Sequence, residues 1–206
     1  MTKSPLVDDL AFARAMAEEG ATAPSLSGRF AVMWGLLVTL ALLAHWAVLR
    51  NILPIEPQYI GLIWLTMGVV GGIATAALRM TLRSKPGQST AGNQAEAAGW
   101  PVVSLVLFSV AACIAASVFF RGQPPILFDM IIPMAFGFYT VMTALSARLF
   151  RTTSSQWQIW LSGLLAAGSA ALLGHPDLYL LAAVGAVLTQ IVPGIMAMRA
   201  EPDAVV

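Results

Sequence analysis

Six long apolar segments, separated by short polar ones, make up most of the 206-residue chain. They run over residues 30–49, 59–78, 101–120, 126–147, 157–174 and 178–198. Each is apolar around most of its circumference, which is typical of a helix buried in lipid or in a bundle. A hydrocarbon core about 30 Å thick requires roughly 20 apolar residues of helix. The pattern therefore predicts an all-α polytopic membrane protein with six transmembrane helices.

The polar segments divide the chain further. Short proline-containing turns follow the first, third and fifth apolar segments, so we expect three helical hairpins. The predicted divisions are an amino-terminal segment at 1–28, a transmembrane domain at 29–199 with a cytoplasmic loop at 79–100, and a tail at 200–206.

The amino-terminal segment predicts a short amphipathic helix. Ser4 can cap it, Pro5 suits its first position and Gly20 can end it. Its apolar stripe at helical spacing consists of Leu6, Leu10, Ala13 and Ala17. The segment has more acidic than basic residues, so docking on the protein's own cytoplasmic face or on a partner suits it better than an anionic membrane surface. A helix that only solvates the terminus is the alternative.

Composition agrees with a lipid environment. Hydrophobic residues make up 58% of the chain and charged residues 10%, whereas soluble domains have about 25% charged residues. The net charge of +1 gives no electrostatic argument for binding nucleic acid. Cys113 is the only cysteine, which excludes an intramolecular disulfide and a multi-cysteine metal site.

The basic residues predict the orientation. Of the 11 Lys and Arg, only Arg50 and Arg121 fall on one side of a six-span topology. The other side holds Lys3, Arg14, Arg29, Arg79, Arg83, Lys85, Arg148, Arg151 and Arg199. Basic residues concentrate in cytoplasmic segments, so we expect both termini in the cytoplasm.

A candidate solute site lies in the last apolar segment. Gln190 is the largest polar group deep in any span, and it follows Thr189 and precedes Pro193. Pro193 removes one helical donor and frees the carbonyl of Thr189. Such a break can line a solute site, or it can be a packing kink satisfied by a neighbouring helix.

A candidate polar cluster lies toward the outer face. It consists of His45, Asp129, His175 and Asp177. Imidazoles and carboxylates together can bind Zn²⁺ or move protons. The chain has no His-x-x-x-His pair and its HPD sequence is an ordinary turn signal, so we expect no metal and no cofactor. Pairing of Asp129 with Arg121 or Arg50 is the alternative.

Small residues at four-residue spacing predict close helix packing. They are Gly68 and Gly72 in the second apolar segment and Ser162, Ala166 and Ala170 in the fifth. The packing partner is a helix of this chain or of another subunit.

Enzyme signatures do not occur in the sequence. We find no G-x-S-x-G, H-E-x-x-H or G-x-x-x-x-G-K-[ST] motif. The polar loop after Arg79 contains glycines, but Lys85 precedes them and no strand leads into the loop, so it does not fit a phosphate-binding loop. We therefore expect no enzymatic activity.

Three stretches carry a resemblance to known proteins. They are DDLAFARAMAEEG with GRF, KPGQSTAGN with a following tryptophan, and PGIMAMRAEP. With them the chain resembles small, uncharacterised six-span membrane proteins of proteobacteria. The resemblance implies a bacterial inner membrane and assigns no functional residue.

Two functional hypotheses follow. The first is a non-enzymatic membrane protein that acts through contacts with the bilayer and with a protein partner on the cytoplasmic face, as a sensor, regulator or accessory subunit. The second is a transporter, channel or solute-binding subunit for a small neutral solute, with a site near Gln190.

Overall fold

The computed structural model describes residues 25–82, 88, 90–150 and 156–200. Its long helices are α2 (Gly28–Leu49), α3 (Ile60–Leu82), α4 (Ala91–Arg121), α5 (Ile131–Leu149) and α6 (Gln156–Ala171). The last helical stretch consists of α7 (Asp177–Ala186), the π-helical turn η3 (Val187–Ile191) and α8 (Val192–Arg199). Two 3₁₀ turns, η1 (Pro57–Tyr59) and η2 (Pro125–Met130), precede α3 and α5. The expected helix within residues 4–20 and the tail after Ala200 lie outside the described residues.

The prediction of an all-α protein with several helices long and apolar enough to span a membrane is confirmed. Among the described residues, five helical stretches meet this condition, namely Gly28–Leu49, Pro57–Thr81, Gly92–Arg121, Pro125–Leu149 and Asp177–Arg199. The sixth, α6, has 16 residues, which corresponds to about 24 Å of helix. The described residues thus fit a multi-pass membrane protein with five to six spans.

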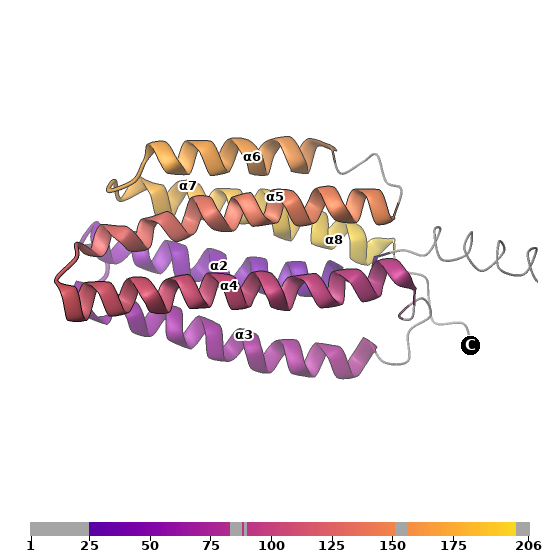
Figure 1. The fold of residues 1–206 in the computed structure, drawn as a ribbon, viewed down its shortest axis with the longest axis horizontal. Coiled ribbons are helices and arrows are strands. Elements are labelled where there is room, and N and C mark those ends of the chain that lie inside the picture. The colour runs from indigo at the N-terminus through magenta and orange to yellow at the C-terminus, as the bar shows by residue number, and fades with distance from the viewer. Residues whose placement is uncertain (1–24, 83–87, 89, 151–155, 201–206) are drawn as a thin grey trace, which may run out of the picture.

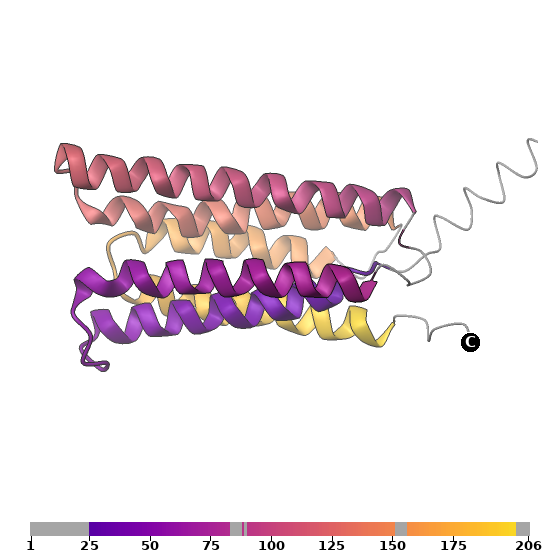
Figure 2. The same ribbon diagram turned by 90° about the horizontal axis from the view of Figure 1, so that it is seen from below.

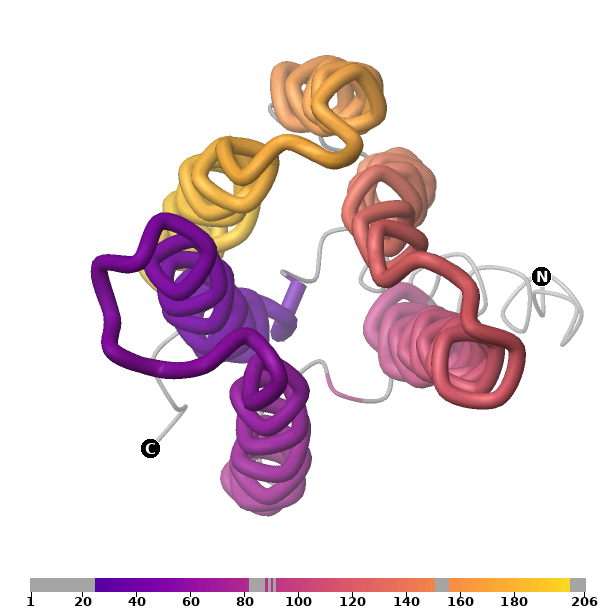
Figure 3. The backbone as a smooth tube through the Cα atoms, turned by 90° about the vertical axis from the view of Figure 1, so that its left-hand side faces the viewer, coloured from indigo at the N-terminus to yellow at the C-terminus, as the bar shows by residue number. Residues whose placement is uncertain are grey.

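The helices form an open ring, seen end-on in Figure 3. Starting from α3, the ring continues through α2, then the α7–η3–α8 stretch, then α6, α5 and finally α4. Figure 2 shows α2 between α3 on one side and the last helical stretch on the other. The two ends of the ring, α3 and α4, each pack mainly along one neighbour.

The ring has two distinct ends (Figure 1). At the hairpin end lie the turns at 50–56, 122–124 and 172–176, which join consecutive helices. At the opposite end α2 begins and α8 ends. We call this the basic end, because it holds Arg29, Arg79, Arg148 and Arg199.

A hydrophobic core fills the part of the ring nearest the hairpin end. It forms where side chains of α2, α5, α6 and α7 meet, and it includes Leu42, Phe136, Leu165 and Leu178. Leu178 is 0% exposed. The apolar faces of α3 and α4 take little part in this core: in the apolar window of α4, 0% of the residues are buried within the chain.

Glycines bring α2 and the last helical stretch into direct backbone contact. A Cβ atom added at Gly28 would lie 2.8 Å from the carbonyl oxygen of Gly194, and one added at Gly194 would lie 2.9 Å from that of Gly28. One added at Gly35 would lie 2.8 Å from a side-chain carbon of Ile191. Only glycine permits this approach, which is how small residues work at helix contacts in membranes.

The expected loop at 79–100 is mostly helical. α3 continues to Leu82 and α4 already begins at Ala91, ten residues before the expected start. Pro101, where the expected span begins, lies inside α4, and Thr90, with extended backbone at φ −67° and ψ 148°, precedes the first turn.

We predict that Gly194→Ala lowers the thermal unfolding midpoint of the purified protein, because the added methyl forces apart two backbones. Overpacking of this kind costs about 1–3 kcal/mol. Gly137→Ala is the matched control, since a Cβ at Gly137 would meet no described atom within 4 Å. An unchanged midpoint in Gly194→Ala would contradict the proposed contact.

Candidate functional site

Asp129 is the centre of a buried polar network at the hairpin end. It is 7% exposed and belongs to η2, directly before α5. The Tyr179 hydroxyl donates a hydrogen bond to its Oδ1, and the Gly174 N–H donates to its Oδ2 at 2.9 Å. The start of a helix also favours a negative charge. Both carboxylate oxygens therefore have donors from other elements.

The turn that supplies one donor requires glycine. Gly174 has φ +82°, in the left-handed region that other residues rarely adopt. A Cβ there would also lie 2.7 Å from the Cδ1 atom of Ile126. The turn between α6 and α7 is thus shaped so that its backbone reaches Asp129.

His45 extends the network to α2 and α3. Its ring is packed against the ring of Tyr179, with centroids 3.7 Å apart. The Trp64 indole N–H donates to its Nδ1 at 3.2 Å, so the neutral imidazole carries its proton on Nε2. His45 and Asp129 are therefore brought together through Tyr179, which the sequence interpretation did not include.

His175 and Asp177 lie apart from this network, on the exposed rim. Arg50 donates to Asp177 Oδ1 at 2.5 Å, and the Trp46 indole N–H donates to the same oxygen at 3.2 Å. The Asp177 N–H donates to His175 Nδ1 at 3.3 Å. The predicted four-residue cluster thus separates into a buried pair and a rim pair. Arg50 pairs with Asp177 and not with Asp129.

Within the described part of the chain, the side chains that could bind a metal ion do not form a metal centre. No three His, Cys, Asp or Glu residues come together there. The buried carboxylate and imidazole accept hydrogen bonds from Tyr179, Gly174 and Trp64. The arrangement fits a set of cross-links between helices better than a ligand site.

Polar groups at the helix break before Pro193 are also hydrogen-bonded within the protein. The Tyr139 hydroxyl of α5 donates to the carbonyl of Thr189, which Pro193 leaves without its helical donor. Thr189 is 0% exposed, and its hydroxyl donates to the Gly185 carbonyl at 2.8 Å. Gln190 is half-buried, with its Cβ beside Gly35. This is the arrangement expected of a packing break.

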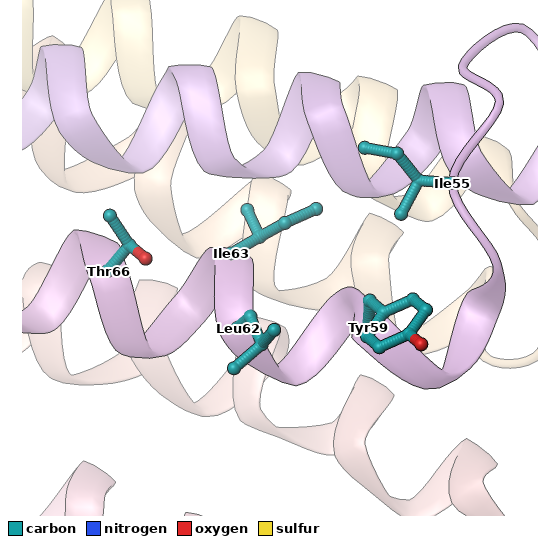
Figure 4. A pocket seen from close by; sticks show the side chains of 5 residues that line it. All are labelled: Ile55, Tyr59, Leu62, Ile63 and Thr66. Atoms are coloured by element: carbon teal, nitrogen blue, oxygen red, sulfur yellow. The ribbon is translucent and has the colours of Figure 1, made fainter.

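Two open depressions lie along α3. One, of about 390 Å³, is lined by Ile55, Tyr59, Leu62, Ile63 and Thr66 (Figure 4). The other, of about 380 Å³, is lined by Gly72, Thr75, Ala76, Arg79 and Met80. Neither is lined by Gln190, Thr189 or Pro193, so they give no support to a solute site at the break.

The predicted packing residues have different surroundings. Ser162 is 0% exposed and accepts a hydrogen bond from the Thr140 hydroxyl at 2.9 Å, and Ala166 packs against the core. A Cβ at Gly68 would touch Phe108 of α4 at 3.6 Å. By contrast Ala170 is exposed, and a Cβ at Gly72 would meet no described atom within 4 Å. Ala170 and Gly72 therefore lie on helix faces that point away from the neighbouring described helices.

A second buried polar junction, at the basic end, was missed from the sequence. Glu96 is 6% exposed, and its Oε2 accepts a hydrogen bond from the Ser25 hydroxyl at 2.8 Å. Asn93 Oδ1 accepts from the Leu26 N–H at 2.9 Å. The first turns of α4 thereby hold the residues that lead into α2. Two signals pointed to it: Thr90 can cap a helix, and Glu96 is the only acidic residue between Glu56 and Asp129.

The chain matches no model of a known protein family, no curated protein and no solved structure. The resemblance to small proteobacterial membrane proteins therefore stays an expectation. The features that bear on function are the buried polar network around Asp129, the polar junction at Glu96 and the outer surfaces of the ring.

We predict that Tyr179→Phe lowers the thermal unfolding midpoint, because it leaves Asp129 Oδ1 without its donor. A buried acceptor deprived of its partner costs about 1–3 kcal/mol. The control is Tyr59→Phe, which removes the same hydroxyl from a residue that is 49% exposed. If both variants unfold at the same temperature, the network does not stabilise the ring.

Proposed function

We propose that the chain is a multi-pass protein of the bacterial inner membrane with no enzymatic activity, and that it acts through protein contacts at its basic end. It serves there as a sensor, regulator or accessory subunit. The observation that carries this proposal is the shape of the basic end, where α4 extends beyond the apolar part of the ring and holds the start of α2.

The length of α4 supports a structured surface outside the membrane. Its 31 residues span about 46 Å, while a hydrocarbon core is about 30 Å thick. The polar residues are at the first turns, from Ala91 to Trp100, and the strongly apolar part follows. Ala97 and Ala98 are exposed on these first turns. A protein partner thus has a rigid helical surface to contact.

A polar junction ties the residues before α2 to the first turns of α4. Ser25 bonds to Glu96 and Leu26 to Asn93. These bonds hold Ser25 and Leu26 beside the projecting turns of α4. A partner that contacts these turns is thereby placed next to the start of α2, which suits a protein that transmits or receives a signal by contact.

The distribution of basic residues supports an orientation. The basic end holds Arg29, Arg79, Arg148 and Arg199, against Arg50 and Arg121 at the hairpin end. The positive-inside rule supports a cytoplasmic basic end and hence cytoplasmic termini.

The solute-carrier alternative has less support. Its candidate carbonyl at Thr189 already accepts a hydrogen bond from Tyr139, and the Thr189 hydroxyl bonds to its own helix. Few hydrogen-bonding groups at Thr189 remain available to bind a solute. We therefore favour the contact function.

Orientation is testable by cysteine labelling. In a Cys113→Ala background, Ile52→Cys at the hairpin end and Ala200→Cys at the basic end each provide one exposed thiol. We predict that a membrane-impermeant maleimide labels the Ile52→Cys variant in intact spheroplasts, and labels the Ala200→Cys variant only after the membrane is permeabilised. The reverse pattern would contradict the proposed orientation.

The contact function is testable by site-specific photo-crosslinking in intact cells. We predict that a photoreactive residue at Ala97 or Ala98 gives one defined adduct with another protein, because these positions face outward beyond the apolar span. Phe120, 88% exposed at the other end of α4, is the control position.

Two outcomes would contradict the contact function. One is the absence of any adduct at Ala97 and Ala98 when the protein is at its native level. The other is the same set of adducts at Phe120, since that would reflect random encounters in the membrane.

A further inference from the structure

The depression on the basic-end half of α3 combines an apolar wall with a cation. Gly72, Ala76 and Met80 form the wall and Arg79 lies at the end nearest the helix terminus, with Thr75 between them. From Gly72 the lining residues recur at intervals of three and four positions along α3, so they share one face of the helix. Met80 is 67% exposed and Arg79 is exposed as well.

The back of this depression is fixed by α2. The Trp34 indole N–H donates to the Thr75 hydroxyl oxygen at 3.0 Å. The ring of Trp34 lies directly on the backbone of α3 at Gly71, where any added Cβ would overlap it. A large aromatic ring therefore holds α3 in position behind the depression.

The front of the depression is open toward the surroundings of the ring. α3 packs along α2 and α4 packs along α5, and the Phe108 ring of α4 lies 3.6 Å from the place a Cβ would take at Gly68, one turn nearer the hairpin end than Gly72. On the facing helix, Val102 is 61% and Leu105 67% exposed. In a bilayer this space is filled by lipid chains or by another apolar group.

Charge decides between these occupants. Within the described part of the chain, the salt bridges involve Arg50, His175 and Asp177, and none involves Arg79. A guanidinium three residues from the end of a spanning helix lies at headgroup depth, where it forms charge-assisted hydrogen bonds with phosphate. Ala76 and Gly72 continue from Arg79 toward the membrane centre, and this apolar surface matches an acyl chain.

We propose that this depression is a binding site for an anionic phospholipid of the leaflet at the basic end. The phosphate is held by Arg79, and one acyl chain lies along Ala76 and Gly72, with Met80 beside the headgroup end. The proposal requires that the chain spans a bilayer, and it is independent of the proposed protein contacts. A free phosphate or a nucleotide would leave the apolar wall unused.

The headgroup part is tested by native mass spectrometry of the purified full-length protein with added lipid. Phosphatidylglycerol and phosphatidylcholine with identical acyl chains are compared. We expect the anionic lipid to bind roughly fivefold more tightly, as one cation near a headgroup predicts. Arg79→Gln should abolish this preference. Arg199→Gln, which removes another exposed arginine at the same end, should preserve it.

The acyl-chain part is tested by filling the wall. Gly72→Leu places a side chain in the depression without a clash, since no described atom lies within 4 Å of a Cβ there. We expect it to weaken binding of both lipids. Gly61→Leu is the control, because a Cβ at Gly61 also meets no described atom within 4 Å and the position is remote from the site.

Three results would overturn the proposal. Equal loss of preference in Arg79→Gln and Arg199→Gln would mean a general attraction of headgroups to the basic end. Equal lipid binding by Gly72→Leu and Gly61→Leu would remove the acyl-chain groove. Displacement of the lipid by millimolar inorganic phosphate would indicate a phosphate site in place of a lipid site.

Discussion

The ring depends on the contact of bare backbones between α2 and the last helical stretch. Gly28 and Gly35 on one side and Gly194 on the other remove the side chains that would keep the helices apart. Among the described helices, α2 and the last helical stretch thereby become neighbours in the middle of the open ring, and the other helices continue from them on either side. α3 stays on the other flank of α2 and α4 on the far side of α5, and these two helices keep most of their apolar surface for the membrane.

Buried polar groups strengthen the same arrangement. Tyr139 reaches from α5 to the free carbonyl of Thr189, and Tyr179 reaches from α7 to Asp129. Each bond joins segments 50 residues apart in sequence, and each satisfies a group that is costly to leave unpaired in an apolar medium. The deep polar chemistry of this chain therefore acts in assembly, which leaves the ends and the lipid-facing sides as the surfaces available for function.

Hydropathy was enough to predict the fold class, because a run of about 20 apolar residues has few uses other than spanning a membrane. It could not predict the order of helices around the ring, because helices that are apolar on all sides do not encode which face meets which neighbour. For this reason His45 and Asp129 were placed at the same depth, but their link through Tyr179 was not foreseen. The boundary of α4 was misplaced because the predicted span covered only the apolar run from Pro101, whereas α4 also includes the polar turns from Ala91. The junction at Glu96 was lost with that boundary.

The π-helical turn η3 has a consequence for insertions and deletions in the last helix. A π-turn accommodates one more residue than the α-helix around it, and each residue rotates the following helix by about 100°. If the same residues continued through Val187–Ile191 as regular α-helix, α8 would be turned by that angle, which would carry Gly194 away from Gly28. The π-turn thus acts as the phase adjustment that lets one helix present Thr189 to α5 and, one turn later, a bare backbone to α2. Deletion of one residue within η3 should consequently keep the orientation of α8, whereas an insertion or deletion elsewhere in the last helical stretch should change it.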